Sequence, residues 1–217
     1  MLLALDTAGV NRTTVALLDA AGHVLGRSVA ISPAECLVPL THDLLREAGA
    51  DMAAVSAIAV GVGPGPYTGL RIGLAHAQAL AHALSVPLIG VSSLAAVAAT
   101  VDPALAQFVV ATDARRKEVF SALVVDDLVK MTTITVGAAA DVASAYPGLS
   151  VIGDGGQRYR DVFDAAGCAQ LQPTVDEATA LATVAARALI DGGLPPFPAY
   201  LREPDAVAAP GFKSVTP

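Results

Sequence analysis

The chain has 217 residues, with 13 basic and 20 acidic side chains and a formal net charge of −7. A protein this acidic has little net attraction to the phosphates of RNA or DNA. If it acts on RNA, we therefore expect a partner protein to bind the RNA. The length suffices for a core without disulfides. Two cysteines, Cys36 and Cys168, exclude a disulfide framework or a CxxC metal site and favour buried thiols in a reduced, cytoplasmic protein.

Three short apolar segments at the N-terminus predict a strand meander. Residues 1–6 end in an aspartate, and an Ala-Gly turn separates residues 13–19 from residues 23–30. The early aspartate and the absence of a basic segment before it argue against a signal peptide. Leucines at helical spacing then predict a helix that Ser32-Pro33 opens and Gly49 closes.

The next elements form an apolar stretch that requires a membrane check. Residues 55–62 predict a buried strand, 67–84 a helix, 87–91 a strand and 92–100 a second helix. Residues 72–101 contain no charged side chain, and this length is sufficient to cross a bilayer. Histidine, glutamine and proline interrupt the stretch, and alanine supplies much of its apolarity. We therefore expect small-residue helices and a buried strand, and no transmembrane helix.

A similar order of elements recurs in the second half. It predicts strands at 107–113, 118–125, 128–136 and 150–156, and helices near 138–145, 157–165 and 176–190. The first strand of each half ends in an aspartate, Asp6 and Asp113. This order predicts an α/β fold of two similar lobes facing a cleft. We expect a first lobe over 1–102, a second over 103–203 and a loose tail over 204–217.

The segment VGPGPYTGLRIG, residues 62–73, follows an apolar strand and opens a helix. A helix N-terminus favours anions, but the segment lacks the lysine of a Walker A loop, and Pro66 breaks the GxGxxG pattern. Pro64 and Pro66 also remove two N–H donors that a phosphate would use. Pro66 fits the first position of the helix instead.

Small residues recur every fourth position along this helix, at Gly69, Gly73, Ala77 and Ala81. Each glycine costs about 1 kcal/mol relative to alanine in a helix, so close packing should compensate. One interpretation is that the stripe packs inside its own lobe. The other is a docking face, exposed in the monomer, that is shared with the helix carrying Leu37 and Leu44 and is covered by another subunit.

The glycine-rich segment resembles the GPGSFTGLRIG hallmark of the TsaB (YeaZ, Gcp-like) family of bacterial tRNA threonylcarbamoyladenosine factors. LALDTA at 3–8, ATDARRKEVF at 111–120, VIGDG at 151–155 and PAYLRE at 198–203 also agree with that family. Pro66 and Tyr67 replace the usual Ser-Phe pair, and Pro33 stands where the family often has a histidine.

The resemblance implies an actin/Hsp70-like ATPase fold, similar to sugar kinases and ribonuclease H. It also implies a non-catalytic subunit that pairs with a TsaD-like paralogue, is joined by a TsaE-like ATPase and meets tRNA only through the complex. We expect no cofactor of its own, ATP and metal in the partners, and a homodimer when the partner is missing. The expected partner-binding residues are Leu37, Leu40, Leu44, Tyr67, Gly69, Leu70, Gly73, Ala77 and Ala81.

The same resemblance puts Asp6, Thr7, Asp113 and Gly153 at a vestigial nucleotide cleft. An acid at the end of a strand can position a metal-bound water, so an ATPase or small-molecule phosphotransferase using this cleft is the alternative function. Asp6 could equally cap the turn that follows it.

Metal chemistry has little support in the sequence. TsaD-type enzymes hold a metal with two histidines on one helix, whereas the corresponding helix here has only His42, and His76 and His82 lie about 240° apart around theirs. The chain has neither an HExxH nor a GxSxG motif, so we expect no metal site and rank a metallopeptidase last.

One basic run, Arg115, Arg116 and Lys117, interrupts the acidic chain. We interpret it as a solvated turn, with a small RNA or partner contact as the alternative.

Overall fold

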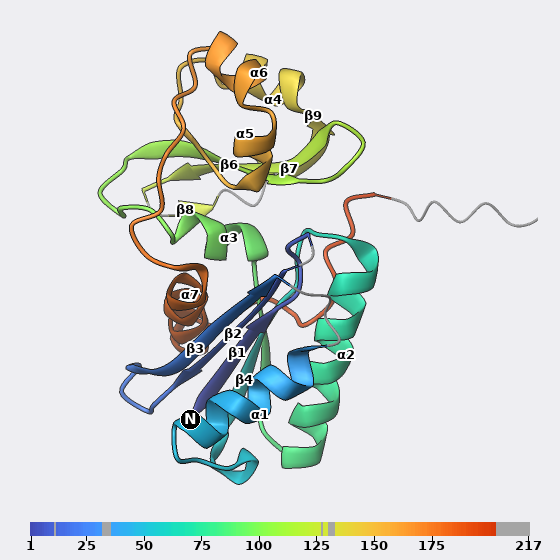
Figure 1. The fold of residues 1–217 in the computed structure, drawn as a ribbon, viewed down its shortest axis with the longest axis vertical. Helices are drawn as coiled ribbons and strands as arrows, with labels where there is room; N and C mark the ends of the chain where they lie inside the picture. Colours follow the sequence, from blue (N-terminus) through green and yellow to red (C-terminus); the bar gives the residue numbers. More distant parts are fainter. Residues whose placement is uncertain (11, 32–35, 127, 130–132, 203–217) are drawn as a thin grey trace, which may run out of the picture.

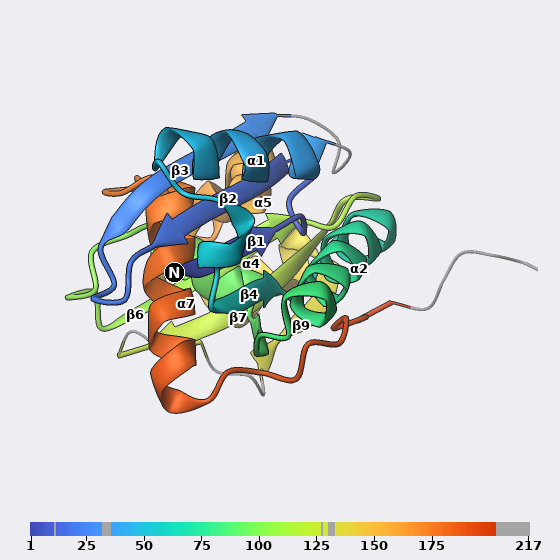
Figure 2. The ribbon, with the colours of Figure 1, turned by 90° about the horizontal axis from the view of Figure 1, so that it is seen from below.

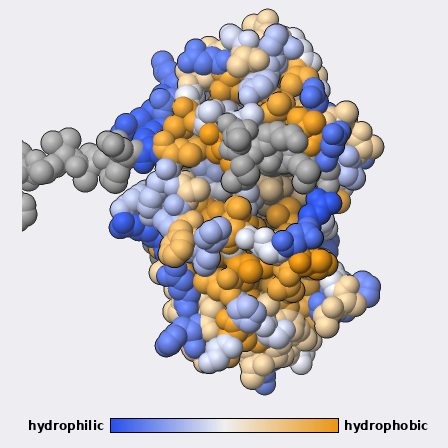
Figure 3. Space-filling model, turned by 180° about the vertical axis from the view of Figure 1, so that it is seen from behind, coloured by the Kyte–Doolittle hydropathy of each residue, from blue (hydrophilic) through white to orange (hydrophobic). Residues whose placement is uncertain are grey.

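The structure, a computed structural model, consists of two α/β lobes stacked along the long axis of the molecule (Figure 1, and Figure 3 from behind). It describes residues 1–10, 12–31, 36–126, 128–129 and 133–202. Pro33 and the predicted tail over 204–217 lie outside the described residues.

A mixed five-stranded sheet forms the centre of the first lobe. Its strands are β1 (Leu2–Asp6), β2 (Arg12–Leu18), β3 (Val24–Ile31), β4 (Ala57–Gly61) and β5 (Leu88–Val91), in the order β3-β2-β1-β4-β5. The meander β1–β3 is antiparallel, as the short turns predict, whereas β4 and β5 run parallel to β1. A short 3-10 helix, η2 (Met52–Ala54), precedes β4 and was not predicted.

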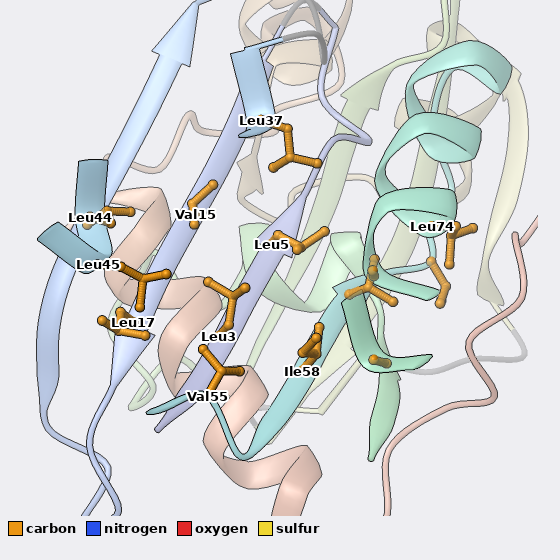
Figure 4. Packing of buried hydrophobic residues seen from close by; sticks show 14 residues of the cluster. Leu3, Leu5, Val15, Leu17, Leu37, Leu44, Leu45, Val55, Ile58 and Leu74 are labelled. Atoms are coloured by element: carbon orange, nitrogen blue, oxygen red, sulfur yellow. The ribbon is translucent and has the colours of Figure 1, made fainter. Parts of the chain in front are cut away.

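Helices cover both faces of this sheet. Helices α1 (Leu37–Glu47) and α2 (Tyr67–Leu84) lie on one face, and α7 (Glu177–Asp191) lies on the other, where α3 (Ser93–Ala98) packs between α7 and the second lobe (Figures 1 and 2). Because side chains alternate along a strand, Leu3 and Leu5 face α1 and α2, and Leu2 and Ala4 face α7. Figure 4 shows the first of these two cores.

The second lobe repeats the plan with shorter elements. Its sheet has the order β10-β6-β7-β8, with β9 also paired to β7, and its helices are α4, α5 and α6. The bounds are β6 (Gln107–Asp113), β7 (Glu118–Val125), β8 (Leu128–Val129), β9 (Thr135–Ala138), β10 (Val151–Ile152), α4 (Ala139–Ala145), α5 (Asp154–Arg158) and α6 (Arg160–Ala165).

The single strand predicted over 128–136 is wrong, because two short strands, β8 and β9, pair with β7 instead. Between them, the N–H of Leu123 donates to the side-chain oxygen of Thr133 at 2.9 Å, where a continuous strand would offer a backbone carbonyl.

The division of the chain at 102/103 does not hold to the C-terminus, because α7 returns to the first lobe. Its buried face of Leu181, Ala182 and Ala185 packs on the sheet face that α1 and α2 leave open. The chain then runs along the same lobe as a segment that we call the C-terminal strap (194–202). Leu194 and Gly90 of β5 exchange two backbone hydrogen bonds of 2.8 Å, and the Ala199 N–H donates to the Val62 carbonyl at 2.8 Å.

Helix α2 begins and ends where the sequence predicts, but Pro66 occupies the N-cap position and not the first helical position. No helix among the described residues combines the length and apolarity needed to cross a membrane.

The small-residue stripe of α2 packs inside its own lobe. The Thr7 hydroxyl donates to the Gly69 carbonyl at 2.7 Å, and a Cβ at Gly73 would lie 2.2 Å from that same hydroxyl oxygen. Ala77 is fully buried. The expectation that this stripe is exposed in the monomer is therefore wrong, and the own-lobe interpretation is confirmed.

This contact predicts that Gly73→Ala destabilises the fold by about 1–3 kcal/mol, because the new methyl group must displace Thr7. A matched control is Gly137→Ala, since a Cβ there meets nothing within 4 Å. Urea denaturation measures both free energies of unfolding. A Gly73→Ala variant as stable as the wild type would contradict this packing.

Candidate functional site

A cavity of about 100 Å³ opens between the two lobes, where the first strand of each lobe ends. Asp6, at the end of β1, and Asp113, at the end of β6, both line it. Further lining residues come from the turn after β1, the start of β2, the turn after β4, α3, and the starts of α5 and α7, and they include Arg12, Pro64, Ser93, Gly153, Asp154 and Glu177. The structure thus brings Asp6, Asp113 and Gly153 together as the sequence predicts.

Asp6 is bonded within its own turn. Its Oδ1 accepts the N–H of Ala8 at 2.7 Å, which confirms the interpretation that Asp6 caps the turn. Burial is the main cause that raises the pKa of Asp6, and hydrogen bonds from Ala8 and Ser93 partly oppose it. Gly61 is required beside it, since a Cβ there would lie 2.2 Å from the Asp6 carboxyl carbon.

Ser93 connects Asp6 to the glycine-rich turn. Its hydroxyl oxygen accepts the N–H of Gly63 at 3.1 Å, and its own N–H donates to the Gly63 carbonyl at 3.0 Å. The turn after β4 is therefore fixed to the first residue of α3.

Thr7 does not line the cavity. Because its hydroxyl is bonded to α2, the predicted place of Thr7 in the cleft is wrong. Thr7 instead fixes α2 against the end of β1.

Asp113 repeats the arrangement of Asp6 in the second lobe. Its Oδ1 accepts the N–H of Arg115 at 3.0 Å and lies 3.5 Å from the Tyr159 hydroxyl. Arg158 Nε lies 3.7 Å from Oδ2. The Asp113 N–H donates to Asp154 Oδ1 at 2.9 Å, so the start of α5 is bonded to the end of β6.

Close packing against the backbone of β6 requires a glycine at position 153. It precedes α5 with φ +112°, and a Cβ there would lie 2.4 Å from the Ala111 carbonyl oxygen. A side chain at this position is excluded, which explains the glycine without a ligand.

The charges around the cavity do not fit a nucleotide with its metal. The carboxyl groups of Asp6, Asp113, Asp154 and Glu177 line the cavity, and Arg12 is the one cation among the lining residues that the structure describes. Arg12 forms an ion pair with Glu177, and Pro64 offers no N–H. Among the described residues, no three His, Cys, Asp or Glu side chains lie close enough to hold a metal ion.

The histidines on α1 and α2 do not resemble a ligand set. Burial lowers the pKa of His76, as does the nearby charge of His42, and His76 Nε2 is buried without a hydrogen-bond partner in the described structure. His82 is exposed in the last turn of α2. Cys168 is buried as predicted, whereas Cys36 is only half-buried, and the two thiols form no disulfide within the described part of the chain.

The predicted partner-binding residues divide into buried and accessible ones. Leu37, Leu44 and Leu70 belong to the core, with exposures of 1%, 3% and 0%, and Leu40 packs beside that core. Tyr67 remains accessible at 38%. Like the glycine stripe, the leucines are already covered by their own lobe.

The accessible surface of α2 lies on its other side, which the sequence pattern did not indicate. Thr68, Arg71, Ala75 and Ala79 are exposed there. The four-residue spacing of small side chains therefore occurs on both faces of α2. Only the leucines within the helix indicate which face is buried.

An aromatic contact fixes the C-terminal strap to α2. The rings of Tyr67 and Tyr200 stack with centroids 4.9 Å apart, and the Arg71 guanidinium lies 3.9 Å above the Tyr67 ring. Arg71 Nε also donates to the Tyr200 hydroxyl at 3.1 Å. The replacement of Phe by Tyr67 keeps the aromatic surface on which this contact depends.

The raised pKa of Asp6 makes the stability depend on pH. Above the ordinary value of 3.8 the unfolded chain loses the Asp6 proton first, so this group lowers stability as the pH rises toward its folded pKa. The Asp6→Asn variant lacks this effect. We expect its free energy of unfolding relative to the wild type to increase as the pH rises above 3.8.

Denaturant unfolding at several pH values measures this difference. Asp51→Asn is a matched control, because Asp51 also accepts a turn N–H, from Ala53 at 3.0 Å, but at an exposed site. A difference between the wild type and Asp6→Asn that stays constant or falls with pH would contradict the burial of a charged Asp6.

Comparisons with known proteins identify the family. The family model described as TsaD, tRNA N6-adenosine threonylcarbamoyltransferase, matches residues 29–186. An uncharacterized protein of Mycobacterium tuberculosis is 38% identical over 94% of this chain and 92% of its own length. The tRNA threonylcarbamoyladenosine biosynthesis protein TsaB of Escherichia coli is 38% identical over 86 residues, which are 39% of this chain and 37% of that protein.

Solved structures agree with this assignment. YeaZ from Pseudomonas aeruginosa superposes with a TM-score of 0.71 and 30% identity, over 92% of this chain and 99% of that one. A ROK hexokinase from Thermus thermophilus has a TM-score of 0.51 at 12% identity, over 88% of this chain and 99% of that one. This second likeness concerns the fold alone and confirms the expected sugar-kinase-like, actin-type architecture. The chain thus belongs to the TsaB (YeaZ) family of tRNA threonylcarbamoyladenosine biosynthesis proteins.

Proposed function

We propose that this chain is a non-catalytic subunit of the cytoplasmic complex that installs threonylcarbamoyl on the tRNA adenosine next to the anticodon. It acts by pairing with a TsaD-like paralogue, and a TsaE-like ATPase joins the pair. The observation that carries the proposal concerns the two aspartates of the cleft. Asp6 and Asp113 each accept an N–H of their own turn, so both carboxyl groups have a structural role. ATP and metal then belong to the partners, and tRNA is bound only in the assembled complex.

The outer face of α2, beside α1, is the surface that we assign to the TsaD-like partner. Ala75 and Ala79 are exposed one turn apart, so a helix of the partner can approach the α2 backbone closely. On α1, Val38 keeps 47% of its surface exposed although it is apolar. The inner face of α2 cannot take part without unfolding the lobe, because Gly73 and Ala77 are buried there. The same outer face supports a homodimer when the partner is missing.

The alternative function is an ATPase or small-molecule phosphotransferase that uses the cavity between the lobes. The cavity itself, with Asp6 and Asp113 at its edge, favours it. ATP turnover by the chain alone that is lost in both Asp6→Asn and Asp113→Asn would replace the subunit role with this one. Turnover no faster than the buffer rate supports the subunit role.

The partner surface is tested by Ala75→Arg and Ala79→Arg. Each puts a charge without a counter-ion into the interface, which costs about 3 kcal/mol or more, so we expect the affinity for the TsaD-like protein to fall at least about a hundredfold. Threonylcarbamoylation of tRNA should fall in parallel when the subunits are dilute.

The matched control is Ala145→Arg, at an exposed alanine on α4 of the second lobe. Isothermal titration measures the affinities, and thermal unfolding shows that each variant is folded. Wild-type affinity in both α2 variants would rule out this face as the partner surface.

A further inference from the structure

The turn between β6 and β7 is held in an unfavourable backbone conformation. Arg115, Arg116 and Lys117 have φ values of 61°, 56° and 63°. The left-handed region is disfavoured for residues with a Cβ, and three such residues in succession are rare. All three side chains are exposed, so burial of these side chains does not compensate for the strain.

Hydrogen bonds from the adjacent strands and from the C-terminal strap hold this turn in place. Asp113 Oδ1 accepts the Arg115 N–H at 3.0 Å, and the Glu118 N–H donates to the Arg115 carbonyl at 2.9 Å. Arg202 of the C-terminal strap donates to the Ala114 carbonyl at 3.2 Å and forms an ion pair with Glu118. The acidic groups next to the turn are thus engaged with its backbone or with Arg202.

Two of the three cations are available to a ligand. Arg115 and Lys117 are exposed and form no ion pair with any residue that the structure describes. In a chain of net charge −7, three adjacent basic residues on a strained, rigid turn form a local positive surface. Strain held at an exposed turn commonly accompanies a binding function.

The turn lies on the same side of the molecule as α2. Arg202 contacts the turn, and Tyr200, two residues earlier, stacks on Tyr67 at the start of α2. Arg71 of α2 is exposed beside this stack, so it extends the positive surface toward the partner face.

We propose that this basic turn, Arg115–Lys117, binds the phosphate backbone of the tRNA that the complex modifies. The inference rests on the proposed function, because a TsaD-like enzyme on α2 brings its tRNA to this side of the chain. Arginine and lysine side chains held on a fixed backbone suit phosphates. Because the chain as a whole has a net charge of −7, we expect it to bind RNA weakly without the partner.

The test uses the complex of this chain with its TsaD-like partner and a tRNA transcript as the probe. The double variant Arg115→Gln, Lys117→Gln removes two charges and retains side chains of similar length. We expect tRNA affinity to fall about tenfold, and the slope of log affinity against log salt to become shallower by about 1.5, since each phosphate contact contributes about 0.7 to 0.9. Affinity for the partner, measured without tRNA, should not change.

The charge-matched control is Arg27→Gln, Arg187→Gln, because these side chains lie on β3 and α7, away from α2. If the Arg115→Gln, Lys117→Gln variant keeps the tRNA affinity and salt slope of the wild type, the proposal is overturned. A loss of affinity for the TsaD-like protein would also overturn it, because the turn would then contact that protein. If the wild-type chain forms no complex, the proposed function fails instead. The inference then fails with it, because it concerns tRNA that is bound in the complex.

Discussion

The contact between Thr7 and α2 determines how the first lobe is built. Thr7 stands directly after β1, and its hydroxyl reaches the backbone of α2 at a point where both Gly69 and Gly73 lack side chains. With a larger residue at either position, the helix would have to move away from the end of the sheet. Because this contact buries the inner face of α2, the outer face, which carries Ala75 and Ala79, is the one that other proteins can contact.

The two lobes share the same hydrogen-bonded turn at the edge of the cleft. An aspartate ends the first strand, and its carboxyl group accepts the N–H of the residue two positions later, Ala8 in one lobe and Arg115 in the other. In the first lobe this N–H belongs to a small buried residue, and in the second it opens a basic, left-handed turn. The same strand-and-turn arrangement is thus followed by a buried residue in the first lobe and by a charged turn in the second. The carboxyl groups at the cleft are committed to structure in both.

Much of the fold could be predicted because local signals agree with each other. The bounds of α2 follow from the proline before it and from its helical spacing, and the central strands follow from uncharged apolar runs. The position of α7 could not be predicted, because its sequence specifies an amphipathic helix but not the sheet that it covers. The split of the strand over 128–136 accompanies a hydrogen bond from the Leu123 N–H to the Thr133 side chain, and no sequence pattern reveals that bond.

The candidate site was predicted in part for the same reason. Asp6 and Asp113 were found because the ends of equivalent strands meet at a cleft. The stripe from Gly69 to Ala81 was assigned to a partner because small side chains allow close helix packing. Small residues also occur on the other face of α2, so their spacing alone does not indicate which face Thr7 occupies. Left-handed φ values at three non-glycine residues leave no signal in a sequence, so the conformation of the basic turn was not foreseen.

The central claim is that the outer face of α2, and not the cleft, makes the working contact of this protein. Site-specific photo-crosslinking tests it most directly, with a photoreactive amino acid at position 79 of α2, at position 145 of α4 or at position 112, which lines the cavity. We expect position 79 alone to form an adduct with the TsaD-like protein when the two are mixed. An adduct from position 112 or 145, with none from position 79, would contradict the claim.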